Sequence, residues 1–256
     1  MISIMEQNKH RKSIILSVVF WLCVWQILSM IIHQEILLVS PFEVLKRLFQ
    51  LLQTGDFYVS ICTSILRILT GFLTGLFAGL VFSILAYRHA WIENLLKPFV
   101  FTIKSIPVAS FIILVLIWVK AAHLAAVISF LMVFPIIYEN ILTGLKATDH
   151  KLLEMAQVFQ IPMSQQIQTI YISSILPYLE SGCSLALGLA WKSGIAAEVI
   201  GLPDSSIGIH LYDAKVYLDT PDLFAWTVVI VVLSVLFEKV FMKLLHILMR
   251  HIEKEL

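Results

Sequence analysis

Six long apolar segments determine what this chain can fold into. Each holds about 20 or more mainly hydrophobic residues, the length that an α-helix needs to cross the hydrocarbon core of a bilayer. They cover roughly residues 13–33, 60–86, 99–119, 123–146, 174–200 and 223–246. None of them alternates apolar and polar residues with period two, so a membrane β-barrel is not indicated. The sequence therefore predicts an all-α membrane protein with six transmembrane helices.

The bulk composition agrees with lipid as the solvent. Of the 256 residues, 59% are hydrophobic and 14% are charged, whereas a soluble domain has roughly 45–50% apolar and about 25% charged residues. The net charge of +1 gives no reason to expect nucleic acid as a partner. The three cysteines lie inside apolar runs without a CxxC or Cys/His pattern, which indicates small hydrophobic residues rather than ligands or bridges.

Basic residues predict the orientation of the chain. Lys9, Arg11 and Lys12 precede the first segment, whose apolar run is longer than the roughly 7–15 residues of a signal-peptide core and lacks a small-x-small cleavage site. We expect a retained first span. With the N-terminus in the cytoplasm, eleven of the 18 Lys and Arg residues lie inside and four lie outside. The sequence thus predicts a multi-pass protein of the cytoplasmic membrane with both termini inside.

Two shorter helices are predicted on the outer face. Residues 40–53 are amphipathic, with Ser40 as N-cap and Pro41 at the first helical position. The loop from Gly201 to Pro221 carries apolar residues at helical spacing and predicts a second outer helix. We expect one transmembrane domain over residues 1–256, in which residues 12–39 form the first span with its outer turn and residues 40–256 form the core.

The segment Lys151–Tyr171, between the fourth and fifth spans, is half polar and helical in pattern. Its first part places Leu152, Met155, Ala156 and Phe159 on one helix face. A proline, Pro162, then ends the helix, because the residue before proline avoids the α region. A helix lying on lipid headgroups usually carries Lys and Arg, but this one has a single Lys and five Gln. An amide-rich face beside an apolar stripe favours a protein groove, although the lipid-surface alternative stays open.

These residues carry a resemblance. Glu154-Met155-Ala156, then Ile170, then Leu176-Pro177 resembles the EAA loop of permease subunits of bacterial ABC importers. The rest of the chain is similar to the branch of that family for nitrate, sulfonate, taurine and related solutes. The matching stretches are Ser40-Pro41-Phe42-Glu43-Val44, Ser64-Ile65-Leu66-Arg67 with Gly71-Phe72, Ser105-Ile106-Pro107, and Leu185 to Trp191 with Ala196-Ala197-Glu198.

The resemblance implies a function and a set of partners. The chain would be the membrane-spanning subunit of an ATP-driven importer and would form half of the pathway for a small solute such as a sulfonate, nitrate or taurine. Two copies of a cytoplasmic ATP-binding subunit, a second permease copy in a homodimer and an extracytoplasmic binding protein would be its partners. Residues 147–173 would be the cytoplasmic coupling segment. The residues expected to couple to the ATPase are Leu152, Glu154, Met155, Ala156, Phe159, Gln160 and Pro162.

Two positions depart from the family pattern. Gln160 stands where the family has glycine, and Ser173 stands where it has a first proline. Glycine would permit a left-handed turn, so we predict that proline makes the bend here instead.

Small residues and charges suggest where a pathway could form. Gly71, Gly75 and Gly79 follow Arg67 at steps of four in the second span, and such spacing lets helices approach closely in lipid. The fifth span has a similar row, which consists of Gly182, Ala186, Ala190, Gly194 and Glu198. Static packing and a moving helix surface are both compatible with these rows.

Ionisable residues inside spans are costly and are usually paired or facing water. Two arrangements are open for Arg67 and Glu198: each has a separate partner, or the two lie close together and tie spans two and five. Lys192, deeper in the fifth span, could meet an anionic solute or a carboxylate of the binding protein. It could equally be a structural lysine that is paired with a carbonyl or with Glu198.

The sequence gives no support for an enzyme. It contains no GxxxxGK[ST] phosphate loop, no GxSxG, no Cys/His dyad and no His spacing typical of a metal site, so no catalytic residue, metal or cofactor is predicted. ATP hydrolysis is expected in a separate partner. The alternative function is a self-contained secondary transporter or channel. It predicts an internal inverted repeat and charges at the midplane, and no repeat is evident.

Overall fold

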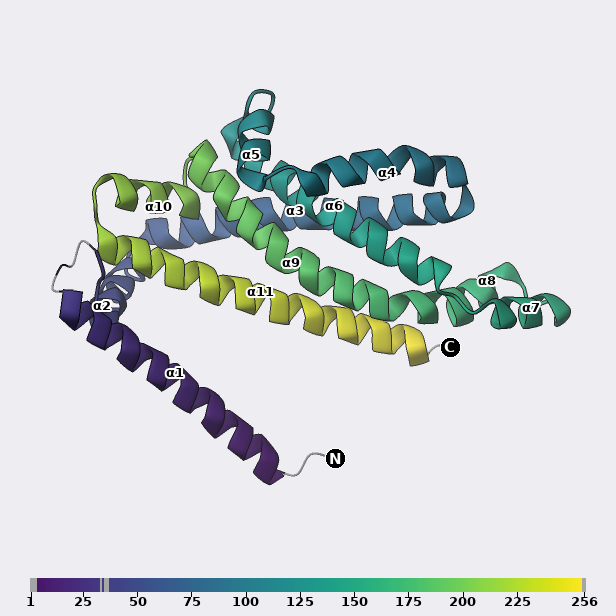
Figure 1. The fold of residues 1–256 in the computed structure, drawn as a ribbon, viewed down its shortest axis with the longest axis horizontal. Helices are drawn as coiled ribbons and strands as arrows, with labels where there is room; N and C mark the ends of the chain where they lie inside the picture. The colour runs from purple at the N-terminus through teal and green to yellow at the C-terminus, as the bar shows by residue number, and fades with distance from the viewer. Residues whose placement is uncertain (1–3, 33, 35–36, 255–256) are drawn as a thin grey trace. The chain divides into compact units, whose positions relative to one another are not determined.

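The computed structural model describes residues 4–32, 34 and 37–254, and the side chains of residues 16–32, 34 and 37–250. All regular secondary structure in those ranges is helical (Figure 1), which confirms the all-α fold class. The helices are α1 Ile4–Ile32, α2 Pro41–Leu51, α3 Gly55–Arg88, α4 Ala90–Ser105, α5 Val108–Leu116, α6 Ala121–Lys146, α7 His150–Val158, α8 Met163–Gln166, the π-helix η1 Ile167–Ile172, α9 Ser173–Gly201, α10 Ile207–Val216 and α11 Thr220–Lys254.

Within the part of the chain that the structure describes, three helical runs are long and apolar enough to cross a membrane. They are α3, α6 and the run Met163–Gly201, which joins α8, η1 and α9. They correspond to the predicted second, fourth and fifth spans. Helices α1 and α11 cover most of the predicted first and sixth spans, but the apolar part of α1 that is described, Leu16–Ile32, is shorter than a full crossing. His33, which ends the predicted first span, lies outside the described residues. The full set of six spans therefore stays a prediction.

The predicted third span, residues 99–119, is not one helix. Helices α4 and α5 meet at a bend of 106°, so they form either a broken span or a re-entrant loop. The break falls at Ile106-Pro107. Ile106 is extended (φ −83°, ψ 131°) because it precedes proline, and Pro107 has no N–H to continue the hydrogen-bond ladder. Pro107 thus divides the predicted third span into two helices.

The Cα atoms of the chain divide into two compact units. The first holds residues 1–58 and 210–230, and the second holds residues 59–209 and 231–256. In the first unit, Ser40 caps α2 as predicted, since its side chain accepts a hydrogen bond from the Glu43 N–H. An ion pair of 2.8 Å joins Arg47 of α2 to Asp222 at the start of α11. Both short helices that were predicted form, as α2 and α10, and their place on the outer face stays a prediction.

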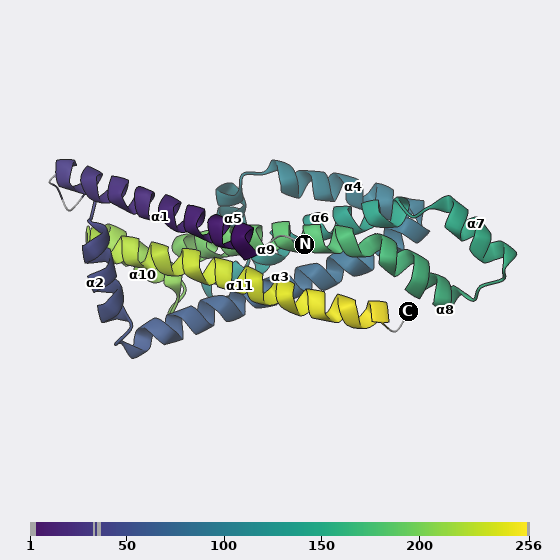
Figure 2. The same cartoon turned by 90° about the horizontal axis from the view of Figure 1, so that it is seen from below.

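Helix α6 is the centre of the second unit. It packs along α9 over much of its length, and Figures 1 and 2 both show the two helices side by side. A cluster around Ile112, Leu124 and Ile128 holds α5 on one end of α6. A second cluster, which includes Val100, Phe134 and Tyr138, holds α4 on the other end. Pro135 lies within α6, which is continuous through it.

Candidate functional site

The predicted coupling segment folds as an elbow between α6 and α9 (Figure 2). Only Ala147–Asp149 separate α6 from α7, and the Asp149 carboxylate caps α7 by accepting a hydrogen bond of 2.9 Å from the Lys151 N–H. On the other side of the bend, α8 continues through η1 into α9 without a break. Both arms of the elbow are thus short, direct extensions of candidate spans.

The bend of the elbow differs from the prediction. Gln160 itself adopts the left-handed conformation, with φ 53°, although glycine is the residue that enters this region at no cost. The Ile161 N–H donates to the Ala156 carbonyl at 2.9 Å, and the Gln160 N–H donates to the Gln157 carbonyl at 3.1 Å. This pair of bonds is a Schellman motif. The expectation that proline alone makes the bend was wrong: the left-handed turn is kept without glycine, and Pro162 follows it.

A side chain braces the bend. The Gln166 Nε2 donates to the Ile161 carbonyl at 2.7 Å, so the start of the second arm is bonded to the turn that precedes it. The angle between α7 and α8 is restricted by the two hydrogen bonds at the end of α7, by Pro162 and by the hydrogen bond from Gln166. The elbow therefore has little freedom to flex at its corner.

The outer surface of the elbow is apolar. Of the predicted face, only Ala156 is buried, while Leu152, Met155 and Phe159 are exposed, Phe159 by 72%. Val158 is 78% exposed. On the second arm, Met163 and Ile167 are also exposed, and they line a cavity that Tyr87 of α3 and Leu145 of α6 border as well. The side chain of Glu154 is also exposed. We call this surface, Leu152, Met155, Val158, Phe159, Met163 and Ile167, the elbow patch. Neighbouring large apolar side chains exposed in this way mark an interaction site.

The glycines of α3 lie against α6. A Cβ on Gly71 would overlap the carbonyl oxygen of Ala126. One on Gly75 would lie 2.9 Å from the Cβ of Val133, and one on Gly79 would lie 2.8 Å from the Cβ of Ile137. The spacing of four thus serves close packing of α3 on α6.

The small residues of α9 also meet α6. A Cβ on Gly182 would lie 3.1 Å from Asn140 of α6. One on Gly194 would lie 2.9 Å from the Ser129 hydroxyl of α6 and 2.6 Å from Ile68 of α3. The Ser129 hydroxyl donates to the Ala190 carbonyl at 3.1 Å. The glycines of both rows thus pack mainly on α6, and Gly194 of α9 also lies against Ile68 of α3.

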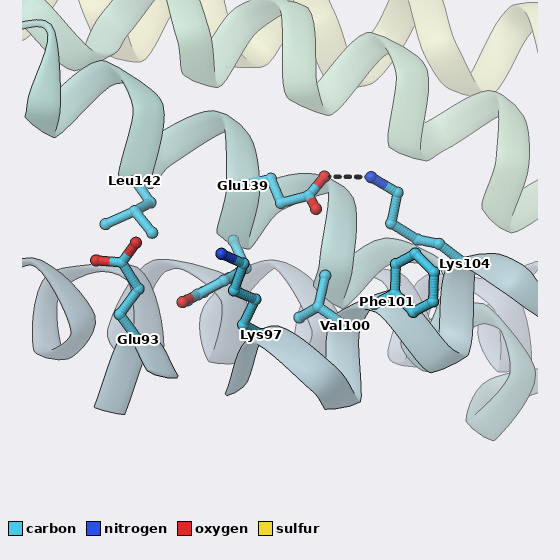
Figure 3. A pocket seen from close by; sticks show the side chains of 8 residues that line it. Glu93, Lys97, Val100, Phe101, Lys104, Glu139 and Leu142 are labelled. Carbon is cyan, nitrogen blue, oxygen red and sulfur yellow. Dashed lines mark hydrogen bonds and ion pairs between the residues drawn. The ribbon is translucent and has the colours of Figure 1, made fainter. Parts of the chain in front are cut away.

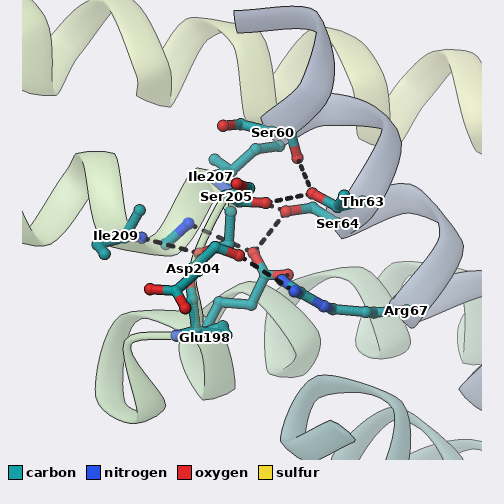
Figure 4. Close-up of polar contacts among 12 residues, drawn as sticks. Ser60, Thr63, Ser64, Arg67, Glu198, Asp204, Ser205, Ile207 and Ile209 are labelled. Atoms are coloured by element: carbon teal, nitrogen blue, oxygen red, sulfur yellow. Dashed lines mark hydrogen bonds and ion pairs between the residues drawn. The ribbon is translucent and has the colours of Figure 1, made fainter. Parts of the chain in front are cut away.

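The hypothesised contact between Arg67 and Glu198 is present (Figure 4). The guanidinium of Arg67 lies 3.5 Å from the Glu198 carboxylate, which is fully buried. Ser64, one turn before Arg67 on α3, donates to Glu198 at 2.6 Å, and the other arm of Arg67 donates to the Asp204 carbonyl at 3.1 Å. One buried carboxylate therefore joins α3, α9 and the loop that follows α9.

The same carboxylate holds the start of α10. The first three N–H groups of this helix each have a side-chain acceptor: Ile207 donates to Ser64 at 3.0 Å, Gly208 to Glu198 at 3.3 Å, and Ile209 to Ser206 at 3.1 Å. A negative charge at a helix N-terminus is favourable because the helix dipole is positive there. We call Ser64, Arg67, Glu198, Ser206 and Gly208 the Glu198 network.

Sequence reasoning missed Gly208. A Cβ at this position would overlap the Cβ and the backbone of Glu198, so glycine is needed for α10 to approach α9. The tertiary contact alone makes this glycine necessary, since its own backbone conformation is not left-handed. Val158 was missed as well, because it lies outside the predicted stripe, and only its exposure places it on the elbow patch.

Lys192 does not join the Glu198 network. It is exposed and has no ion pair among the residues whose side chains are described. One turn before it, a Cβ on Gly188 would meet nothing within 4 Å. Ser181 and Leu185 continue the same exposed face. Helix α9 thus has a packed side against α6 and an open side that carries a lysine.

The candidate spans, the hydrogen-bonded Glu198 network and the apolar elbow together indicate a multi-pass membrane protein. Comparison with known proteins names the family. Residues 71–256 match the family described as "Binding-protein-dependent transport system inner membrane component". The chain belongs to this family, and it is a transport permease of the inner membrane rather than an enzyme.

Individual relatives are similar over most of their length. The chain is 27% identical over 216 residues to the aliphatic sulfonates transport permease protein SsuC of Bacillus subtilis, covering 83% of this chain and 78% of the relative. It is 25% identical to the nitrate import permease protein NrtB of Synechococcus elongatus, with coverages of 76% and 73%. It is 20% identical to the taurine transport system permease protein TauC of Escherichia coli, with coverages of 84% and 80%.

Proposed function

We propose that this chain forms half of the translocation pathway of an ATP-driven importer for a small solute that carries an oxyanion group. Its family and its relatives named for sulfonates, nitrate and taurine support this class of solute. In this proposal both termini are cytoplasmic, six helices cross the membrane, and an extracytoplasmic binding protein delivers the solute. The family favours this function over a self-contained secondary transporter or channel.

The elbow patch is the observation that carries the coupling role. Its apolar side chains are exposed in a segment whose corner is fixed and whose arms continue into α6 and α9. A groove on an ATP-binding subunit would cover Phe159 and its neighbours and gain the free energy of burying them. When two such subunits close on ATP, a stiff elbow would pass their displacement to α6 and α9 together.

A binding experiment tests the coupling role. Phe159→Asp places a charge in the centre of the elbow patch, whereas Gln168→Asp adds the same charge to an exposed polar position of η1. Copurification of the ATP-binding subunit with tagged permease should be lost for Phe159→Asp and retained for Gln168→Asp. Glu154→Ala tests the motif acid in the same assay. Equal retention of the subunit by Phe159→Asp and Gln168→Asp, with both variants folded, would refute docking at the elbow.

The open side of α9 is the candidate for the pathway itself. An ammonium group in a spanning helix is unfavourable unless it meets water or an anion. Lys192 has neither a carboxylate nor a carbonyl partner among the residues whose side chains the structure describes. We expect a second copy of the chain, in a homodimer with two ATP-binding subunits, to face this side and to enclose a polar space around Lys192. Gly188 leaves room for a solute or a partner helix next to the ammonium group.

Uptake measurements test Lys192. Lys192→Met keeps the length of the side chain and removes its charge. It should raise the half-saturating concentration of an anionic solute or reduce its uptake by about tenfold or more, since a hydrogen bond to a charged group is worth roughly 1.5–3 kcal/mol. Lys192→Arg keeps the charge and should restore part of the uptake. Unchanged uptake by Lys192→Met would remove Lys192 from the pathway.

A further inference from the structure

A cavity of about 270 Å³ lies between α4 and α6 (Figure 3), and it shares no lining residue with the elbow patch or the Glu198 network. Its walls are Glu93, Lys97, Val100, Phe101 and Lys104 of α4, and Tyr138, Glu139 and Leu142 of α6. The five α4 residues stand at positions i, i+4, i+7, i+8 and i+11, so they form one face of that helix. A single water occupies roughly 30 Å³ of liquid volume, so the cavity has room for a small ionic group together with water.

Two ion pairs hold the ends of this cavity. Lys104 lies 2.6 Å from Glu139, and Lys146, at the end of α6, lies 2.5 Å from Glu93. Each carboxylate of the cavity wall therefore already has a cation of its own. Lys97 lies between Glu93 and Lys104 along α4, as Figure 3 shows, and no ion pair is recorded for it among the described side chains. The cavity and its flanking pairs thus carry one positive charge in excess.

A buried hydroxyl is the second unsatisfied group. Tyr138 is only 3% exposed, and within the described part of the chain its Oη has no hydrogen-bond partner. Native proteins rarely leave such an atom without a partner. A phenol O–H is a donor, so the group that would satisfy it must accept a hydrogen bond. The walls of the cavity therefore carry the ammonium of Lys97, which is exposed and has no ion pair, and a buried donor on the facing helix that has no acceptor. An anion with acceptor oxygens would satisfy both groups.

We propose that this cavity binds one singly charged oxyanion group, held by the ammonium of Lys97 and the hydroxyl of Tyr138. The group is either the phosphate of an anionic lipid headgroup or a free inorganic oxyanion, since both present the same acceptor atoms and charge. Phe101, which lines the cavity and is 71% exposed, gives its rim an apolar part. The bound anion would bridge α4, the first arm of the broken span, to α6. Because α6 leads into the elbow, the anion would also favour one position of α4 relative to the helix that the elbow moves.

Two variants and one control test the site in the full-length chain. Lys97→Gln removes the charge, Tyr138→Phe removes only the hydroxyl, and Lys120→Gln removes an exposed charge at the opposite end of α6. Each protein is reconstituted in phosphatidylcholine nanodiscs, in nanodiscs with added phosphatidylglycerol, and in phosphatidylcholine nanodiscs with inorganic phosphate. The unfolding temperature and the amount of phosphatidylglycerol retained on detergent extraction are measured for each.

If the cavity binds an anion, the unfolding temperatures of the four proteins should respond differently to it. The anion should raise the unfolding temperature of the native chain and of Lys120→Gln, and should bind Lys97→Gln and Tyr138→Phe about tenfold more weakly. A rise with phosphatidylglycerol alone assigns the site to a lipid headgroup, and a rise with inorganic phosphate assigns it to a free ion. Without anion, Tyr138→Phe should be at least as stable as the native chain, because the lost hydroxyl has no partner.

Other results would overturn the proposal. No response of the native chain to either anion, or an equal response of Lys97→Gln and Lys120→Gln, would show that the cavity holds no anion. A loss of stability by Tyr138→Phe without anion would show that the hydroxyl has a partner within the protein. Because none of these measurements involves transport or ATP, they stand apart from a failure of the proposed function.

Discussion

The Glu198 network and the elbow patch differ in whether an energetically unfavourable group is satisfied within the chain. In the network a fully buried carboxylate is satisfied within the chain, by Ser64, Arg67 and the Gly208 N–H. On the elbow, six large apolar side chains are left exposed, although the backbone beneath them is fixed by a Schellman motif. A region whose polar groups all have partners within the chain serves to hold helices together, so we call the Glu198 network a structural joint. A region with a restrained backbone and an exposed apolar surface is suited to contact with another molecule. Substitutions should therefore affect folding in the first region and association in the second.

Glu198→Ala should produce the largest effect. It would leave Arg67, Ser64 and the Gly208 N–H without their acceptor, and breaking a buried ion pair on one side typically costs about 3–5 kcal/mol. We expect the free energy of unfolding in detergent to fall by that amount. Glu180→Gln is the matched control, because its partner His246 is about half exposed, and it should change stability by less than about 0.5 kcal/mol. Similar stability of the two variants would mean that the network is not a joint.

Val158→Asp should separate the two regions most clearly. Val158 is 78% exposed and contributes little to the fold, so the free energy of unfolding should change by less than about 0.5 kcal/mol. Affinity for the ATP-binding subunit should fall by about 30-fold, the loss typical of a contact worth roughly 2 kcal/mol. Gln157→Asp, its exposed polar neighbour on α7, is the control. A purely structural elbow would show the opposite pattern, with lost stability and unchanged association.

Gly75→Leu and Gly188→Ala compare the packed and the open sides of the helices. A Cβ on Gly75 already lies within 2.9 Å of Val133, so the larger side chain should cost about 1–3 kcal/mol of stability. Gly188→Ala enters open space and should stabilise α9 by up to about 1 kcal/mol, because alanine favours helix more than glycine does. Thermal unfolding measures both. If a second copy packs on this side of α9, Gly188→Leu should weaken the dimer without unfolding the chain.

Gln160→Gly should give the smallest effect and the opposite sign. A left-handed residue with a side chain is strained by about 1–2 kcal/mol relative to glycine, part of which returns as the greater freedom of glycine in the unfolded chain. We therefore expect a gain in stability of less than about 1 kcal/mol and unchanged binding of the ATP-binding subunit. A loss of stability would indicate that the Gln160 side chain makes a contact that offsets its backbone strain.

The sequence by itself determined the helical class, the positions of most helices and the location of the elbow. Long apolar runs, the cap at Ser40 and the proline at position 162 act locally, and local chemistry is readable along the chain. The residues at steps of four identified Arg67 and Glu198 as ends of two helix faces. The cost of an unpaired charge in lipid made their contact one hypothesis beside separate partners for each, and only the folded structure selects the contact.

Only the tertiary structure decided how those faces are used. The glycine rows of α3 and α9 both pack mainly on α6, Gly208 is required by Glu198, and Val158 is exposed, since each depends on which distant helix lies opposite. The 106° break in the third span and the left-handed Gln160 likewise depend on how a local preference balances against the contacts around it. Periodicity along a chain identifies the faces of a helix, but the partner that covers each face is a property of the folded molecule.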